Sequence, residues 1–269
     1  ALGAVLFGRP DFKAAAGECP EEVFWLLGRD GVGGFDSMEA DDRPLGSRAL
    51  PDAGLYVIRS EGGRDYALVR AGSPAPHAPT AHAHNDTLSL ELWVDGQPVF
   101  VDSGTYCYTG DLERRDQFRS TKAHNTVAVD GEEISSLPAG QPFRLGPQAR
   151  VHVVQWRPDG DEVRLVAQHD GFREVTHRRT VRYLPKSREW RIEDELRGKG
   201  AHETTWYWHL PPGRSLWLEG MEADLGPVRM VWETEENFSL DLKRWQHSPS
   251  YGRVQGSSVL VGRYIWEEQ

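Results

Sequence analysis

The chain has 269 residues, 38% of them hydrophobic, and a formal net charge of −10. This length can bury the core of one large domain or of two small ones, whereas the negative charge argues against a nucleic-acid-binding protein or another general binder of polyanions. No run of about 18 apolar residues is present to span a membrane, and two cysteines are too few for a disulfide framework.

Residues 1–50 predict a short α-helical segment followed by a linker. Residues 1–28 are Ala-rich at first, then carry Pro20 ahead of an apolar run that stops at Gly28, which is the usual placing of Pro and Gly around a helix. The start lacks a charged leader and does not read as a signal peptide. Residues 31–51 are rich in Gly and Asp and predict a long loop. Two short helices cannot bury their apolar faces alone, so we expect them to pack on the rest or to belong to an absent domain.

Residues 51–269 alternate between apolar and polar side chains and predict antiparallel strands. In residues 88–101 an alternating run, an Asp95-Gly96 turn and a second apolar run predict a β-hairpin. Other predicted strands are residues 55–60, 66–71, 125–130, 151–156, 163–168, 178–184, 190–196, 204–210, 215–219, 228–234, 238–242 and 258–265. About a dozen short strands with regular turns predict a mainly β fold, a large antiparallel β-sandwich.

Residues 81–125 hold most of the chemistry-bearing side chains. His82, His84, Asp102 and His124 fall in this stretch, interleaved with Tyr, Arg and Lys. Two imidazoles and a carboxylate suit Zn²⁺, with Mn²⁺, Fe²⁺ or Ca²⁺ as alternatives, and the third imidazole would remain free for a substrate. The spacing matches no short metal motif, so a buried polar network of His and Asp that braces a sandwich loop is the competing interpretation.

The predicted hairpin poses a geometric difficulty for such a metal site. With a two-residue turn at Asp95-Gly96, Asp102 would pair with Ser89, which is roughly 16 Å from His84 at strand rise. Either residues 85–87 bend the first strand back, or the pairing is less simple. In an extended segment His82 and His84 point the same way, so that one could bind metal while the other faces a ligand.

Four further patterns allow a functional interpretation. His84, Asp86 and His124 have the form of a facial iron triad, but residues 130–137 lack the Arg that an oxygenase needs for its oxo-acid. Residues 206–208 predict a packed aromatic stripe rather than a sugar-stacking platform. Residues 177–179 predict a basic strand face that is exposed to solvent. Four basic residues could supply a local pocket for a polyanion: Arg114, Arg115, Arg119 and Lys122.

Three segments together resemble the heparinase II/III-like family of polysaccharide lyases. They are His-Ala-His-Asn-Asp at residues 82–86, Val-Asp-Ser-Gly-Thr-Tyr at 101–106 and Arg-Ser-Thr-Lys-Ala-His-Asn at 119–125. The similarity is clearest over residues 55–131, and residues 206–210 resemble a later family element. The resemblance implies an N-terminal α/α toroid and a C-terminal sandwich of the lyase super-sandwich type. Residues 1–50 would then be the end of the toroid, and residues 51–269 the sandwich domain.

The resemblance also implies an activity, β-elimination on acidic polysaccharides that contain uronic acid, such as alginate, a glycosaminoglycan or a bacterial exopolysaccharide. It implies metal ligands at His84, Asp102 and His124. The other implied roles are catalysis by His82 and Tyr106 and substrate binding by Arg119 and Asn125.

The principal base of the family, a toroid residue, matches no position of this sequence. We therefore expect the toroid domain as a partner and little activity without it. A glycan-binding or scaffolding domain without turnover is the alternative, and a periplasmic or extracellular location in a bacterium is expected.

Overall fold

The structure, a computed structural model, describes residues 1–43, 45–72, 81–147, 149–226, 228–234 and 237–268. The chain divides into two compact units, Ala1–Leu45 and Gly46–Gln269. This division lies close to the boundary expected at residue 50. Within the described residues, no helix combines the length and the apolar character needed to cross a membrane.

The first unit is helical and contains α1 (Leu2–Phe7), α2 (Pro10–Ala16) and α3 (Glu21–Ser37). Gly28 interrupts α3 with φ 67° and ψ −162°, so the predicted stop is present, but the helix resumes after it. The loop predicted from residue 31 is therefore wrong over residues 31–37. Phe35 is buried, and Lys13 Nζ donates to the carbonyls of Phe35 at 2.7 Å and Met38 at 2.5 Å. Packing against α2 thus stabilises a helix end that its Gly-rich sequence disfavours.

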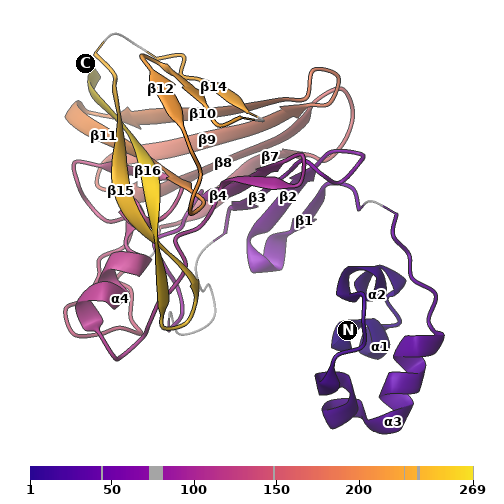
Figure 1. The fold of residues 1–269 in the computed structure, drawn as a ribbon. Coiled ribbons are helices and arrows are strands. Elements are labelled where there is room, and N and C mark those ends of the chain that lie inside the picture. Colours follow the sequence, from indigo (N-terminus) through magenta and orange to yellow (C-terminus); the bar gives the residue numbers. More distant parts are fainter. Residues whose placement is uncertain (44, 73–80, 148, 227, 235–236, 269) are drawn as a thin grey trace. The chain divides into compact units, whose positions relative to one another are not determined.

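The second unit contains four antiparallel sheets (Figure 1). The first, in the order β1-β2-β3-β4-β5, comprises Arg48–Leu50, Leu55–Arg59, Tyr66–Arg70, Leu90–Val94 and Gln97–Phe100. The second, β10-β9-β8-β7, comprises Glu189–Gly198, Val175–Leu184, Val163–Phe172 and Val151–Arg157. The third, β15-β16-β11-β6, comprises Ser239–Ser250, Arg253–Glu268, Gly200–Leu210 and Val127–Val129. The fourth, β12-β13-β14, comprises Trp217–Glu219, Glu222–Asp224 and Arg229–Val231.

The main hydrophobic core joins all four sheets, as the sandwich prediction requires. Strands β2, β3 and β9 bury alternate residues, because successive side chains of a strand point to opposite faces. Phe100 of β5 packs on Trp208 of β11 with ring centroids 4.9 Å apart. Trp208 is buried in this core and Trp206 packs against it, which confirms the packed aromatic stripe.

Residues 177–179 differ from the solvated basic face that their sequence suggested. His177 and Arg179 are buried, at 0% and 1% exposure. On β9 both occupy the inward positions of the alternation, where Arg179 forms an ion pair with Asp194 of β10 at 2.7 Å. The charges of this run are therefore part of the interior, and the prediction of a solvated face is wrong for two of its three residues.

The predicted hairpin around Asp95-Gly96 is present as β4 and β5. Asp95 and Gly96 both have positive φ, at 52° and 73°, as a type I′ turn requires. The sequence analysis missed the short strands β1 and β13, the second half of β15 and the helix α4 (Leu112–Arg119). Asp111 caps α4 by accepting a hydrogen bond from Arg114 N at 3.0 Å.

Candidate functional site

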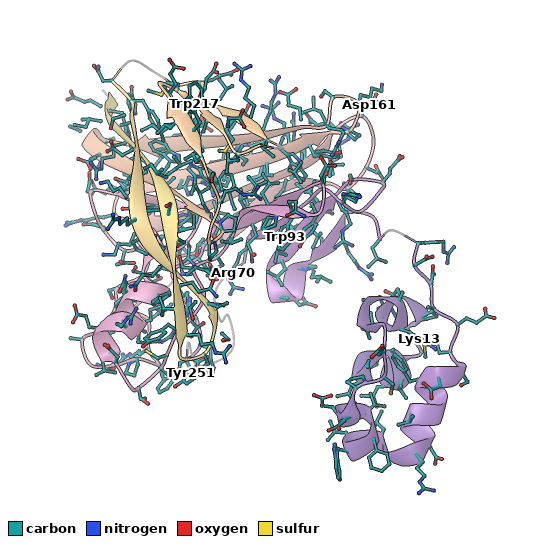
Figure 2. All side chains as sticks on the ribbon, in the orientation of Figure 1. Lys13, Arg70, Trp93, Asp161, Trp217 and Tyr251 are labelled. Carbon is teal, nitrogen blue, oxygen red and sulfur yellow. The ribbon has the colours of Figure 1, made fainter. Side chains whose placement is uncertain are left out.

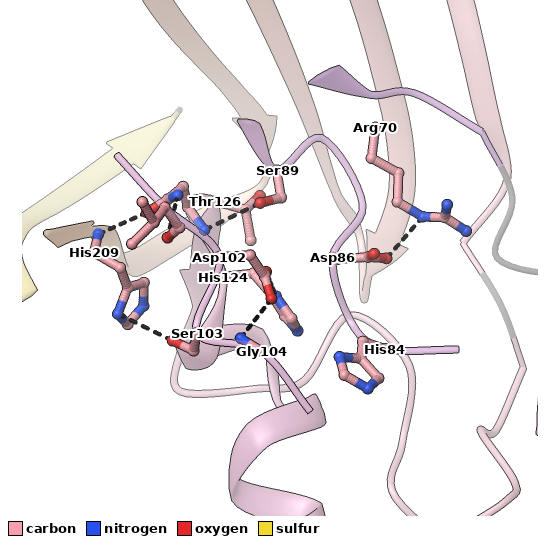
Figure 3. Close-up of polar contacts among 12 residues, drawn as sticks. Arg70, His84, Asp86, Ser89, Asp102, Ser103, Gly104, His124, Thr126 and His209 are labelled. Atoms are coloured by element: carbon pink, nitrogen blue, oxygen red, sulfur yellow. Dashed lines mark hydrogen bonds and ion pairs between the residues drawn. The ribbon is translucent and has the colours of Figure 1, made fainter. Parts of the chain in front are cut away.

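A bend in the chain resolves the distance problem between His84 and Asp102. Ser89 N donates to Asp86 O at 2.9 Å, and Leu88 takes a left-handed φ of 56°. The chain therefore turns at residues 86–89, and β4 begins only at Leu90. This is the bend that the sequence analysis offered as one of two solutions. It brings His84 to within ring-contact distance of His124 (Figure 3).

Asp102 and His124 form the central pair of the site. His124 Nδ1 lies 2.5 Å from Asp102 Oδ2, and because a carboxylate only accepts, Nδ1 carries the proton. Burial alone would raise the pKa of Asp102, but the charge and hydrogen bond of His124 lower it to about 2. Burial would lower the pKa of His124, yet the Asp102 carboxylate raises it above its ordinary value. Each group therefore favours the charged form of the other.

His84 is held by a cation. Its Nε2 lies 2.7 Å from Arg115 Nη1, and since a guanidinium only donates, this nitrogen accepts and the ring is neutral. Burial, and then the charge of His124, lower the pKa of His84 well below its ordinary value. The rings of His84 and His124 are 5.2 Å apart between centroids. The two imidazoles thus lie side by side next to one carboxylate.

The hairpin of β15 and β16 supports the loop that carries Asp102. Ser248 N donates to Ser103 O, and His247 Nδ1 donates to the carbonyl of Asp102 at 3.0 Å. Gly104 N donates to Asp102 Oδ1 at 2.7 Å. Gly104 has φ 86°, and a Cβ there would lie 2.2 Å from Ser248 O. Only glycine allows this close approach between loop and hairpin.

His82 and Tyr106, the two predicted catalytic residues, contact aromatic side chains outside the His84–Asp102–His124 cluster. The side chain of His82 is exposed and contacts the ring of Tyr108 at 5.1 Å. Tyr106 has a left-handed φ of 60°, a strained conformation for a bulky residue that clusters at functional sites. Its ring packs on Phe118, and Arg114 lies over its face at 4.2 Å.

Arg119 and Asn125, the predicted substrate ligands, are fully buried at 0% exposure. Arg119 bonds to Asp116 and donates to the carbonyls of residues 141 and 144. Asn125 Nδ2 donates to the carbonyls of residues 90 and 101, and its Oδ1 accepts from His209 N at 2.6 Å. In this structure both act as framework residues that bond to the protein itself, and the substrate-binding role implied by the resemblance stays a prediction.

The predicted metal ligands His84, Asp102 and His124 are gathered in one place, but they contact one another and Arg115 rather than a common centre. Within the described parts of the chain, no group of three or more His, Cys, Asp or Glu side chains is arranged to hold an ion. His124 Nε2 is buried and has no hydrogen-bond partner there. A buried imidazole nitrogen whose other nitrogen is oriented by a carboxylate is the ligand arrangement typical of zinc proteins. The donor chemistry therefore fits a zinc ion.

The structure gives little support to the iron triad of His84, Asp86 and His124. Its carboxylate, Asp86, forms an ion pair with Arg70 at 2.9 Å (Figure 3). Of the four basic residues considered as a pocket for a polyanion, Arg115 and Arg119 are fully buried, so they do not form an open basic surface.

The sequence analysis did not assign Arg115 and His209 to the candidate site. Arg115, Phe118 and Arg119 form the buried face of α4, a spacing of three and four residues typical of one helix side. The signal for this helix in the sequence was Asp111, a residue type that caps helices and that precedes this spacing. His209 Nε2 donates to Lys122 O at 2.9 Å, and burial lowers its pKa to about 3. Its signal in the sequence was its place within residues 206–210, the segment that resembles a later family element.

Comparison with known proteins identifies the family of this chain. A family model described as "Heparinase II/III-like, C-terminal" matches residues 42–263. The chain belongs to this family. The resemblance noted in the three sequence segments is thereby confirmed.

Individual relatives agree with the family assignment. The chain is 28% identical over 172 residues to a heparin-sulfate lyase of Bacteroides stercoris, covering 62% of this chain and 23% of that protein. The structure of the heparan sulfate lyase HepC from Pedobacter heparinus superposes with a TM-score of 0.70 at 17% identity, covering 96% of this chain and 40% of that one.

A heparinase III structure superposes with a TM-score of 0.69 at 21% identity, covering 91% of this chain and 39% of that one. These likenesses confirm the sandwich fold. The chain spans about a quarter of the length of the lyase relative, at 23%, and about 40% of the solved ones.

Proposed function

We propose that this chain is the sandwich part of a polysaccharide lyase that cleaves uronic-acid-containing polysaccharides by β-elimination. The observation that carries the proposal is the cluster of His84, Asp102 and His124 with the exposed His82 beside it, in a member of the heparinase II/III-like family. Relatives of this chain are named as lyases of heparin and heparan sulfate. A glycosaminoglycan that contains uronate is therefore the first substrate to test.

The reaction removes the proton on C5 of a uronate, and the electron pair then expels the oxygen on C4 to leave an unsaturated sugar. The C5 proton is weakly acidic, so the uronate carboxylate has to be neutralised while a base takes that proton. Neutralisation by positioned donors is the largest contribution available to such a site. The exposed imidazole of His82 is suited to meet the carboxylate or to carry the proton. The phenol of Tyr106 is suited to proton transfer at the leaving oxygen.

The lyase proposal is tested with heparan sulfate, alginate and hyaluronan as substrates. We expect the protein with its toroid domain to release unsaturated uronate from at least one of these polymers, and this chain alone to release little or none. Release is followed by the rise in ultraviolet absorbance of the conjugated product. The same polymers are offered in a binding assay. A polymer that is bound with no unsaturated product under any condition would instead favour a glycan-binding domain without turnover.

Zinc binding at His84, Asp102 and His124 is part of the proposal. The ion would tie three separate segments of the chain together and supply positive charge beside His82. We expect about one zinc ion per chain after loading and desalting, and a higher melting temperature with zinc than with a chelator. The measurements are elemental analysis and thermal unfolding, neither of which depends on activity.

The matched variants use two His–Asp pairs of the same domain. His124→Ala and Asp102→Ala should lose the bound zinc and its thermal shift. His202→Ala should keep both, since His202 pairs with Asp130 at 2.7 Å on a different part of the sandwich. Retention of zinc in His124→Ala at the level of the parent chain would contradict the assignment.

A helical domain larger than residues 1–45 is the proposed partner of the sandwich. The helical unit exposes several large apolar side chains, Leu6, Phe7, Phe24, Trp25 and Leu26. Exposed apolar clusters of this kind mark surfaces that pack on further protein. The toroid of the family would supply such a surface and the principal base. A bacterial periplasmic or extracellular location, where such polymers are met, remains part of the proposal.

A further inference from the structure

Three aromatic side chains from distant segments gather next to His84. The rings of Tyr108, Phe143 and Tyr251 form this group, which we name the aromatic surface. Tyr108 lies at its centre, 5.7 Å from each of the other two between ring centroids, and His82 borders it at 5.1 Å from Tyr108. Phe143 is 42% exposed and Tyr251 is 65% exposed. Single exposed aromatic residues are common, but an exposed group beside a candidate site indicates binding.

The position of Tyr251 is built by the fold. It lies in the turn between β15 and β16, at the end of the long hairpin, close to α4 (Figure 2). Gly252 N donates to Tyr106 O at 2.7 Å, and Arg114 of α4 bonds to Gln246 of the hairpin. These contacts join the hairpin end to the loop that also carries Asp102. Tyr251 is thereby held beside the site while most of its side chain remains in solvent.

A buried cation lies under this surface. Arg115 is fully buried, with its guanidinium carbon 5.0 Å from the Tyr108 ring centroid. Its Nη1 bonds to His84, and its Nε donates to the carbonyl of Pro142. Its Nη2 has no hydrogen-bond partner in the described ranges, and the charge of Asp116 offsets only in part the effects of burial and of the like charge of Arg119, which lower the pKa of Arg115. Buried charges are normally paired, so the positive charge of Arg115 makes the surface above it attractive to an anion.

We propose that the aromatic surface and Arg115 together bind one anionic pyranose residue of a polysaccharide, next to the sugar on which His82 acts. The apolar face of the ring would stack on Tyr251 and Phe143, and its carboxylate or sulfate would be attracted by the positive charge of Arg115, which lies buried beneath the Tyr108 ring. This inference rests on the proposed function, and it assigns the subsite that selects acidic sugars. Neither aromatic residue touches the reacting atoms, so both act on binding and not on the chemical step.

The test compares Tyr251→Ala and Phe143→Ala with Trp217→Ala, an exposed aromatic of β12 with 59% exposure. Tyr251 and Trp217 are mostly in solvent and Phe143 is exposed at 42%, so folding is expected to be retained. Oligosaccharides of heparan sulfate and of alginate, with a neutral cello-oligosaccharide as control, are titrated by calorimetry. We expect each of the first two variants to weaken binding of an acidic oligosaccharide about tenfold, which corresponds to about 1.4 kcal/mol, and Trp217→Ala to bind as the parent chain does.

Each outcome of these measurements supports or overturns the subsite. A raised KM with unchanged kcat in Tyr251→Ala supports the subsite where lyase turnover is measurable. Acidic-sugar binding that depends on Tyr251, without turnover even when the toroid domain is present, supports the subsite and removes the proposed lyase function. Acidic-sugar binding unchanged in both aromatic variants overturns the subsite while leaving the lyase function standing. Equal binding of the neutral oligosaccharide or of duplex DNA, or no binding by the parent chain at millimolar sugar, also overturns it.

Discussion

Replacing Asp194 by asparagine should lower the free energy of unfolding by about 3–5 kcal/mol, because it leaves a buried guanidinium without its counter-ion. Arg179 is 1% exposed and bonds to both carboxylate oxygens of Asp194, at 2.7 and 2.8 Å. Its remaining terminal nitrogen donates to the carbonyls of Leu88 and Asn125. The same ion pair therefore secures the bend that precedes β4 and the residue after His124.

Asp194 also anchors a chain of neutral histidines. His177 Nε2 donates to it at 2.7 Å, and His177 Nδ1 accepts from His169 at 3.1 Å. Trp206 Nε1 donates to its other oxygen at 2.9 Å. Removing the negative charge leaves Arg179 uncompensated and weakens the hydrogen bonds from His177 and Trp206 at once, which is why a substitution of equal size is expected to cost so much.

Chemical denaturation of the two chains measures this effect, with Asp170→Asn as the control. Asp170 pairs with Arg150 at the surface, where the exposed fractions are 38% and 90%, and such pairs contribute about 0–1 kcal/mol. A loss in Asp194→Asn no larger than in Asp170→Asn would contradict the prediction.

The stabilisation by Asp194 should also depend on pH. Burial alone would raise the pKa of Asp194, but the charge and hydrogen bonds of Arg179, with that of His177, hold it well below its ordinary value. A carboxyl group with a lowered pKa stabilises the fold at pH above its unfolded value of about 3.9, and loses this contribution as the pH falls below it. The difference between the parent chain and Asp194→Asn should therefore shrink in acid.

In the protein that includes the toroid domain, replacing His82 by alanine should reduce lyase turnover by about 10²–10⁴-fold, the contribution typical of a positioned general acid or base. The side chain is exposed and lies beside the aromatic surface and not within the His84–Asp102–His124 cluster. Folding and zinc content should therefore be unchanged. The measurements are the initial rate of unsaturated uronate formation, the melting temperature and the metal content.

His152→Ala is the matched control, since His152 is an exposed histidine of β7. It should keep full turnover. The kinetic pattern separates His82 from Tyr251, because loss of the first should lower kcat, whereas loss of the second should raise KM. Unfolding or loss of zinc in His82→Ala would assign His82 to the structural framework instead.

Much of the fold could be predicted from local sequence. The hairpin at Asp95-Gly96 and the longer strands can be predicted because their patterns involve only residues that are neighbours in the sequence. The helix α4 was missed, since its buried face consists largely of Arg115 and Arg119, which a search for apolar periodicity does not find. The restart of α3 after Gly28 was missed because Lys13 and the burial of Phe35, both non-local, stabilise it.

The sequence by itself determined the family, the sandwich and the set of polar residues from which the site is made, because these are encoded in local alternation and in three short segments. Only the tertiary structure decided what each residue does there. Arg119 and Asn125 became framework residues, and Arg115 became the partner of His84. The physical reason is that burial and hydrogen-bond partners come from elements distant in the sequence, such as the β15–β16 hairpin, whose packing no local pattern specifies.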